Sequence, residues 1–178
     1  YVYGEFVGIS PESVTNFSDS QGRPFAVAQF ASSTKVLEMR FATSYISVEQ
    51  AKKNLQLEIS EGASFDSVLS DAKALWNEIL NTVEVKGASE QELCRLYSSL
   101  YKMFLFPKNY SENTGTAELP VFKYCSPYSG SADNPTISEG QMYAGNGFWD
   151  TYRTEWPALF LLAPERAGKL LDGMIQHY

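Results

Sequence analysis

One stretch organises this sequence: Gly145-Asn146-Gly147-Phe148-Trp149-Asp150-Thr151-Tyr152-Arg153-Thr154-Glu155-Trp156-Pro157. It contains two of the three tryptophans together with acidic, basic and hydroxyl side chains. An apolar run, Ala158-Leu159-Phe160-Leu161-Leu162-Ala163, follows directly. This order predicts a polar, aromatic-rich loop that leads into a buried helix. Binding residues are often placed on such loops, which a rigid scaffold holds in position.

Chemistry alone allows two interpretations of Trp149 and Asp150. In the first, the indole stacks on the apolar face of a sugar ring while the carboxylate accepts hydrogen bonds from two hydroxyl groups. In the second, Trp149 and Trp156 belong to the core and Asp150 is the N-cap of the following helix, a position that Asp favours. Arg153 could hold the Asp150 side chain in place or donate a hydrogen bond to the sugar. Alternatively, it is a surface cation without a role in binding.

Three segments resemble motifs of glycoside hydrolase family 92, the calcium-dependent exo-acting α-mannosidases. Residues 148–154, followed by Pro157 and an aliphatic run to Pro164, are similar to the family's Trp-Asp-Thr-Phe-Arg signature. Residues 97–107 resemble its Tyr-x-x-Leu-Tyr segment closed by Pro, and residues 44–55 its Ser-Phe-Ile-Ser-x-x-x-Ala-x-x-Asn-Leu segment. The sequence departs from the pattern at Asn146-Gly147-Phe148, where many members carry Phe-Ser-Leu, and at Glu155-Trp156, where many carry another residue and His.

The resemblance implies part of an enzyme that releases terminal mannose from α-mannosides with inversion, of the α-1,2-linked N-glycan type. It implies substrate binding at the −1 subsite by Trp149, Asp150 and Arg153. The catalytic carboxylates and the ligands of a calcium ion are expected outside this chain, so we assign neither a catalytic nor a metal-binding residue. Two other readings stay open: a non-catalytic glycan-binding module, and a different glycosidase on an (α/α)6 barrel, because helical barrels host several chemistries.

The resemblance also predicts an α+β architecture in three parts. Residues 1–62 are the end of an N-terminal antiparallel β-sandwich, residues 63–88 a linker helix, and residues 89–178 the start of an incomplete (α/α)6 catalytic barrel. The chain is expected to be an internal piece, because it begins within an extended segment and ends within a helical pattern that lacks a C-cap signal. Its partners would then be mannose-containing glycans and the remainder of its own polypeptide.

Charge and composition narrow the classes of partner. The formal net charge is −7 and the pI about 4.8, which argues against nucleic acid and against attachment to an acidic membrane. No apolar run reaches the roughly 20 residues needed to span a bilayer. Two N-glycosylation triplets, Asn16-Phe17-Ser18 and Asn109-Tyr110-Ser111, favour a secreted or extracytoplasmic location. Cys94, among apolar neighbours, is interpreted as a buried free thiol.

Strands are expected at the N-terminus, around Val2–Ile9, Phe25–Phe30 and Val36–Ala42, with a turn region between Ser10 and Arg23. In the last strand, Leu37, Met39 and Phe41 form an apolar face, which predicts a sheet covered on that side.

Helices are expected after the capping boxes Ser47–Gln50 and Ser89–Glu92, and over residues 64–83, where Trp76 belongs to an amphipathic stripe and to the core. Residues 108–147 form a long loop, with Val121–Tyr124 and Gln141–Tyr143 as a hairpin within it. Asp133 is interpreted as an Asx-turn residue before Pro135, and His177 as a helix-end residue.

Overall fold

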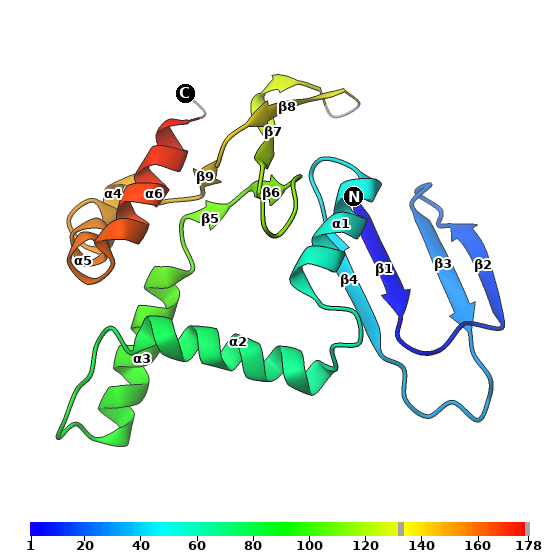
Figure 1. Cartoon of the computed structure of the whole chain (residues 1–178), viewed down its shortest axis with the longest axis horizontal. Coiled ribbons are helices and arrows are strands. Elements are labelled where there is room, and N and C mark those ends of the chain that lie inside the picture. The colour runs from blue at the N-terminus through cyan, green and yellow to red at the C-terminus, as the bar shows by residue number, and fades with distance from the viewer. Residues whose placement is uncertain (132–133, 177–178) are drawn as a thin grey trace.

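The structure, a computed structural model, describes residues 1–131 and 134–176 as small antiparallel sheets and helices (Figure 1). These residues form, in order, β1 Val2–Phe6, β2 Ser13–Ser18, β3 Pro24–Gln29, β4 Met39–Thr43, α1 Val48–Glu58, α2 Phe65–Leu80, α3 Glu90–Phe104, β5 Lys108–Asn109, β6 Ser111–Asn113, β7 Phe122–Gly130, β8 Pro135–Glu139, β9 Tyr143–Ala144, α4 Phe148–Thr151, α5 Glu155–Leu162 and α6 Pro164–Ile175. β1 pairs with β4, β2 with β3 and β5 with β9, and β7 lies between β6 and β8. The predicted mixed α+β class is confirmed; Asp133 and His177 lie outside the described residues.

Helix α1 covers the polar face of the β1–β4 pair, whereas the apolar face, which was predicted to be the covered one, is left exposed within this chain. Met39 and Phe41, expected on the covered side, are 53% and 60% exposed, whereas Arg40 is partly buried. Arg40 Nε donates to Glu5 Oε1 at 2.6 Å, which satisfies both charges on the covered side. Met39 lies against Gly4, where an added Cβ would be 2.8 Å from its methyl group. Alternation identifies the two faces of a strand, but it does not identify the face that receives the helix.

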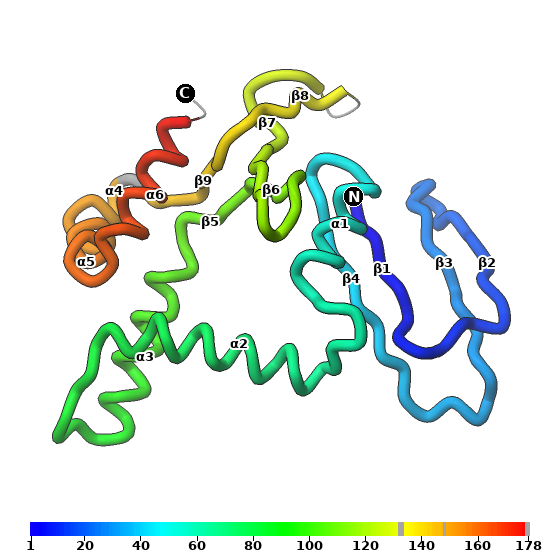
Figure 2. The backbone as a smooth tube through the Cα atoms, viewed as in Figure 1, coloured from blue at the N-terminus to red at the C-terminus, as the bar shows by residue number. Residues whose placement is uncertain are grey.

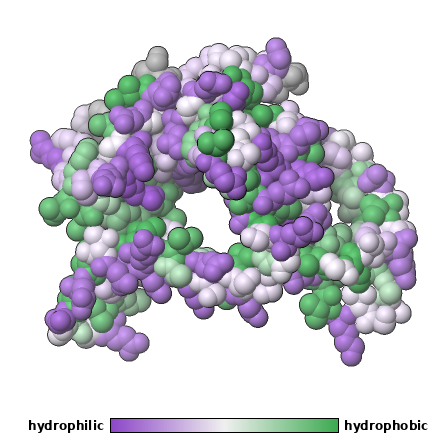
Figure 3. Space-filling view, in the orientation of Figure 1, coloured by the Kyte–Doolittle hydropathy of each residue, from purple (hydrophilic) through white to green (hydrophobic). Residues whose placement is uncertain are grey.

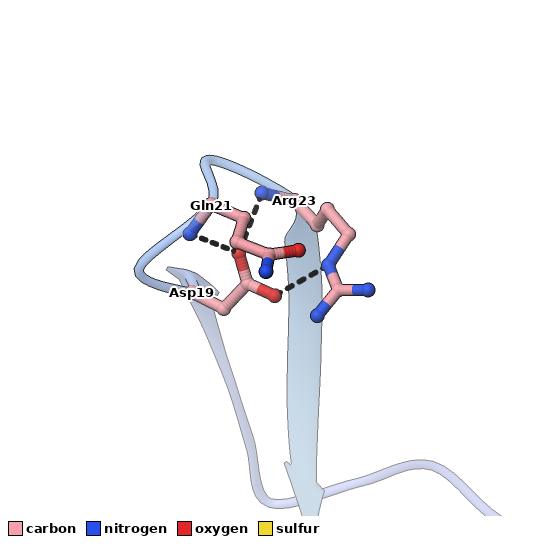
Figure 4. A network of polar contacts seen from close by, with 3 residues as sticks. All are labelled: Asp19, Gln21 and Arg23. Carbon is pink, nitrogen blue, oxygen red and sulfur yellow. Dashed lines mark hydrogen bonds and ion pairs between the residues drawn. The ribbon is translucent and has the colours of Figure 1, made fainter.

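The region between Ser10 and Arg23 contains a strand, although it was predicted to be a turn. β2 pairs with β3 in a hairpin, and Asp19 closes the connection between them (Figure 4). One carboxylate oxygen of Asp19 accepts from the backbone N–H groups of Gln21 (2.8 Å) and Arg23 (2.9 Å), and the other accepts from Arg23 Nε (2.6 Å). These bonds lower the pKa of Asp19, the one from the Arg23 backbone most of all. The true turn is therefore short and built on one carboxylate.

Helix α1 begins at the predicted N-cap, but only half of the predicted capping box forms. Ser47 Oγ accepts from the Gln50 backbone N–H at 3.0 Å. The Gln50 side chain does not return to Ser47; it donates to Asn54 Oδ1 at 2.8 Å and to the Asn113 carbonyl at 2.9 Å. The Ser47 N–H donates instead to Ser44 Oγ at 3.2 Å. Gln50 therefore makes a tertiary contact in place of a local cap.

We call Gln50 and Asn54 of α1, together with Glu112 and Asn113 of β6, the polar seam. Asn54 Nδ2 donates to Glu112 Oε2 at 2.7 Å, and Glu112 Oε1 accepts from the Tyr45 backbone N–H at 2.7 Å. Gln50 and Asn54 are both only 7% exposed. Because buried amide groups are costly when unpaired, these bonds tie the N-terminal sheet and α1 to the middle of the chain.

Helix α2 spans the molecule, and most of its predicted apolar stripe is uncovered. Its N-cap is Ser64, as expected from the predicted range, but the helix has no buried residue. Phe65 and Leu75 are 69% and 62% exposed. Only the C-terminal end is covered: Trp76 is half-buried against the core, with its ring 4.4 Å from that of Tyr101, so its predicted core role is confirmed. No helix in the described ranges is long and apolar enough to cross a membrane.

The backbone encloses an opening. α2 runs along the lower side, and β6 meets α1 on the upper side, so the path from α1 through α2 and α3 back to β6 closes on itself (Figure 2). The space-filling view shows this opening passing through the molecule above α2 (Figure 3). α2 and the polar seam therefore both connect the N-terminal and C-terminal portions.

Helix α3 forms the second predicted capping box completely. The Ser89 N–H donates to Glu92 Oε2 at 2.8 Å, and Glu92 N–H donates to Ser89 Oγ at 3.4 Å. At the other end, Arg166 of α6 donates to the Phe104 carbonyl at 3.0 Å, which satisfies a free acceptor at the helix terminus. Cys94 is exposed on α3, so its predicted burial is wrong.

The described part of residues 108–147 contains β5 to β9, and the hairpin predicted within this region is wrong. β7 contains most of the first predicted strand, but it pairs with β6 and β8. Tyr143 belongs to β9, which pairs with β5. β5 and β9 have two residues each. Such short strands cannot be predicted from an alternation of apolar and polar residues.

The main core lies where α3, α5 and α6 meet. Its buried members are Phe104, Leu159, Ala167 and Leu170. α6 also packs closely on β9, since a Cβ added to Gly173 would be 2.3 Å from the Tyr143 ring and 3.0 Å from the Gln141 carbonyl. This close approach requires glycine, although the helical backbone there does not.

We expect Gly173→Ala to lower the free energy of unfolding by about 1–3 kcal/mol, the usual cost of overpacking. Gly168→Ala in the same helix is the matched control, because nothing lies within 4 Å of its added Cβ. There, alanine should stabilise by about 0.5–1 kcal/mol through helix propensity. Urea unfolding of both variants measures the difference; equal shifts would contradict the close contact with Tyr143.

Candidate functional site

The stretch from Gly145 to Pro157 forms a corner between β9 and the core. Gly145 follows β9 with φ +88°, a left-handed conformation that glycine adopts without strain. Gly147 is the N-cap of the four-residue helix α4, and α5 begins at Glu155. The chain therefore turns twice within a few residues and presents the side chains of Trp149 and Asp150 at the surface.

Trp149 and Asp150 are exposed on α4. Trp149 is 84% exposed, so it does not belong to the core in this structure. Asp150 is the third residue of α4, and it is the N-cap of neither α4 nor α5. Its carboxylate receives no hydrogen bond from the described residues, and its Oδ2 atom lies 3.3 Å from the position of an added Cβ on Gly147. Trp156, by contrast, is half-buried and packs against the core.

Arg153 lies apart from Asp150. Its guanidinium carbon is 5.1 Å from the centre of the Tyr152 ring, an arrangement in which the cation interacts with the aromatic face. Within the described ranges Arg153 forms no ion pair, so it does not hold Asp150 as one prediction proposed. Both Tyr152 and Arg153 are exposed. An exposed cation on a ring is available to donate to a ligand, which leaves the second predicted role open.

Two threonines tie α4 to its neighbours. Thr151 Oγ1 lies 2.6 Å from Asn146 Oδ1 and also contacts the Gly147 carbonyl oxygen. Thr154 Oγ1 donates to the Asp150 carbonyl at 2.5 Å. Since α4 is a single turn without a side-chain cap, these contacts replace the cap that such a short helix needs.

A hollow of 320 Å³ borders α4. Apolar and aromatic side chains line it together with two polar ones: Asn146, Thr151, Tyr152, Trp156, Phe160, Leu171 and Met174. Glu155, at the start of α5, has a buried Oε1 atom without a partner in the described part of the chain. Burial raises the pKa of Glu155 above its ordinary value.

Sequence reasoning singled out Trp149, Asp150 and Arg153 but missed the contacts of Asn146 and Thr151. A signal was present, because Thr often bonds the carbonyl four residues earlier, and Gly147 stands at that spacing from Thr151. No comparable spacing rule predicts the contact between Thr151 and Asn146. That contact depends on the two turns of the chain around α4.

The described residues do not form a calcium site by themselves. Calcium takes six to eight oxygen ligands, usually with several carboxylates. In the ranges 1–131 and 134–176, no three acidic, His or Cys side chains gather in a way that suits a metal ion. We therefore derive no chemical step through a metal from this chain.

Comparison with known families identifies most of the chain. Residues 50–178 match the family described as the glycosyl hydrolase family 92 catalytic domain. The chain belongs to glycoside hydrolase family 92. The matched range contains α4 and the whole corner, so the resemblance predicted from three short motifs is confirmed.

Solved family 92 structures share the fold of the whole chain. An inverting mannosidase of this family from Bacteroides thetaiotaomicron superposes on 99% of the chain with a TM-score of 0.81 and 29% identity. An α-mannosidase of the family from the same bacterium, solved in complex with mannoimidazole, covers 99% with a TM-score of 0.78 and 18% identity. The chain corresponds to 24% of the length of each. No curated protein matches the sequence.

Proposed function

We propose that this chain is part of an exo-acting α-mannosidase that releases terminal mannose from α-mannosides with inversion. The match of residues 50–178 to the family 92 catalytic domain carries this proposal. The 29% identity to a protein described as an inverting mannosidase supports it. The exposed pair Trp149 and Asp150, on a corner fixed to the core by α5, supports a place at the −1 sugar.

The proposal divides the chain into three parts. Residues 1–62 form the end of an N-terminal β-sandwich, residues 63–88 contain the linker α2, and residues 89–178 begin an (α/α)6 barrel. The uncovered apolar face of β4 and the absence of buried residues on α2 support further packing partners. The apolar hollow beside Trp156 would then receive side chains from the remainder of the same polypeptide.

In this role Trp149 lies against the apolar face of the mannose ring, and Asp150 accepts hydrogen bonds from two of its hydroxyls. Arg153, turned out over Tyr152, donates to the sugar or its aglycone. The general acid and the base that activates water belong to the remainder of the polypeptide, about 6.5–9.5 Å apart as inversion requires. A calcium ion, with ligands outside this chain, would supply positive charge to the sugar hydroxyls.

The proposed substrate is an α-1,2-linked mannoside of an N-glycan, and the proposed location is secreted or extracytoplasmic. Both triplets that accept N-glycans have an exposed asparagine, since Asn16 lies on the exposed strand β2 and Asn109 on β5. Net negative charge and the absence of a basic cluster support partners other than nucleic acid or an acidic membrane.

The test is NMR of the anomeric protons after an α-1,2-linked mannobiose is added, in calcium buffer, to the full-length polypeptide that contains this chain. We expect mannose to appear first as the β anomer, because water attacks the face opposite the leaving group. Binding without release would favour a glycan-binding module. Release only from an α-glucoside would favour another (α/α)6 glycosidase, and either result would overturn the proposal.

A further inference from the structure

We propose that Thr151 is a positioning residue for Asp150: with Asn146 it locks α4 to the preceding loop, and this fixes the direction of the Asp150 carboxylate. The inference rests on the proposed role of Asp150 in binding the mannoside. It concerns residues that do not themselves need to touch the sugar. Three observations carry it. The Thr151 hydroxyl contacts both Asn146 and Gly147, α4 has no side-chain cap, and the Asp150 carboxylate lies near Gly147.

The Thr151 hydroxyl sits between two oxygens with only one proton to give. It is 2.6 Å from Asn146 Oδ1 and in contact with the Gly147 carbonyl, while Asn146 Nδ2 is buried without a partner in the described part of the chain. A half-turn of the Asn146 amide resolves this, because Nδ2 then donates to Thr151 Oγ1 and Thr151 donates to the Gly147 carbonyl. An unpaired buried oxygen is also better tolerated than an unpaired N–H.

The resulting chain of hydrogen bonds, Asn146 to Thr151 to Gly147, holds the N-terminal end of α4. Helices of one turn are not stable by themselves, since the first turn fixes several residues for a single hydrogen bond. Gly147 offers no side chain to cap α4. The Asn146 and Thr151 side chains therefore supply the restraint at the N-terminal end, and the bond from Thr154 to the Asp150 carbonyl supplies it at the other end.

This restraint reaches the carboxylate through Gly147. The carbonyl of Gly147 is the acceptor for Thr151, and Asp150 Oδ2 lies 3.3 Å from the position of an added Cβ on the same glycine. The residue that Thr151 holds is thus also a near neighbour of the carboxylate. Without the Thr151 hydroxyl, α4 is free to unwind and Asp150 loses its fixed direction toward a ligand.

The test uses Thr151→Val and Thr151→Ser in the full-length polypeptide, with kinetics on an α-mannoside well below the melting temperature. Valine removes the hydroxyl at nearly constant shape, and we expect kcat/KM to fall by about 3- to 10-fold, as for the loss of one neutral hydrogen bond. Serine keeps the hydroxyl and should restore most of that loss. If Thr151→Val fails to fold, Asn146→Ala replaces it in the series, because it removes the group that donates to the Thr151 hydroxyl.

The Asp150→Ala background separates positioning from a purely structural role. If Thr151 acts through Asp150, Thr151→Val causes no further loss once Asp150 is gone. Additive losses would overturn the inference, as would a Thr151→Val enzyme as active as the parent while Asp150→Ala is impaired. An unimpaired Asp150→Ala enzyme would remove Asp150 from the site and overturn both this inference and the proposed site.

Discussion

Asp150→Ala in the full-length polypeptide should lower kcat/KM on an α-mannoside by about 10- to 150-fold, the equivalent of about 1.5–3 kcal/mol for a hydrogen bond to a charged group. The loss should leave the fold intact, because Asp150 is exposed and its carboxylate bonds none of the described residues. Steady-state kinetics measure the loss, and thermal unfolding measures the fold.

The control for this change is Asp172→Ala, which removes another exposed carboxylate, on α6 and outside the corner. It tests whether the loss of one negative charge alone affects the rate. We expect parent-like kinetics from it. Similar losses in both variants would attribute the effect to charge, and parent-like kinetics for Asp150→Ala would remove this residue from the sugar site.

Leu159→Ala should lower the free energy of unfolding by about 2–5 kcal/mol, because it removes a fully buried side chain and leaves a cavity. Leu159 is 0% exposed at the centre of the core that joins α3, α5 and α6. Urea unfolding of the 178-residue chain measures the change. The large expected effect follows from position, since a packed core refills such a cavity only in part.

Leu161→Ala is the matched control for this prediction. It makes the same chemical change two residues further along α5, where the side chain is 80% exposed. We expect a change within about 0.5 kcal/mol, as for most surface substitutions. Equal destabilisation by both variants would mean that Leu161 is covered in the protein as purified, for example by a second copy of the chain.

Helix starts were predictable from the sequence because their determinants are local. The N-cap serines Ser47 and Ser89 act within three residues of themselves, and both open a helix as expected. Yet the side chain of Gln50, which was predicted to complete the capping box at Ser47, donates its hydrogen bonds to Asn54 and Asn113 instead. A contact across more than 60 residues outcompeted the local one, and no window of sequence around Ser47 contains that information.

Sheet faces and pairings were the least predictable features, because they depend on what covers each strand. The apolar side of β4 was visible in the sequence, but the helix that followed packed on the side of Arg40, where Glu5 was available to pair with it. At the candidate site, Trp149 and Asp150 were found through the motif. The hydrogen bond between Thr151 and Asn146 could not be predicted, because it depends on how the chain turns in space around α4.

The polar seam has a consequence for synthesis of the protein on the ribosome. Tyr45 meets Glu112 across 67 residues, and Asn54 meets it across 58. α1 therefore leaves the exit tunnel long before its partners on β6, and its amide side chains stay hydrated until α2 and α3 have emerged. The N-terminal sheet completes its native contacts only after β6 has emerged, so a pause in translation before that point would prolong the period in which exposed strands can pair wrongly.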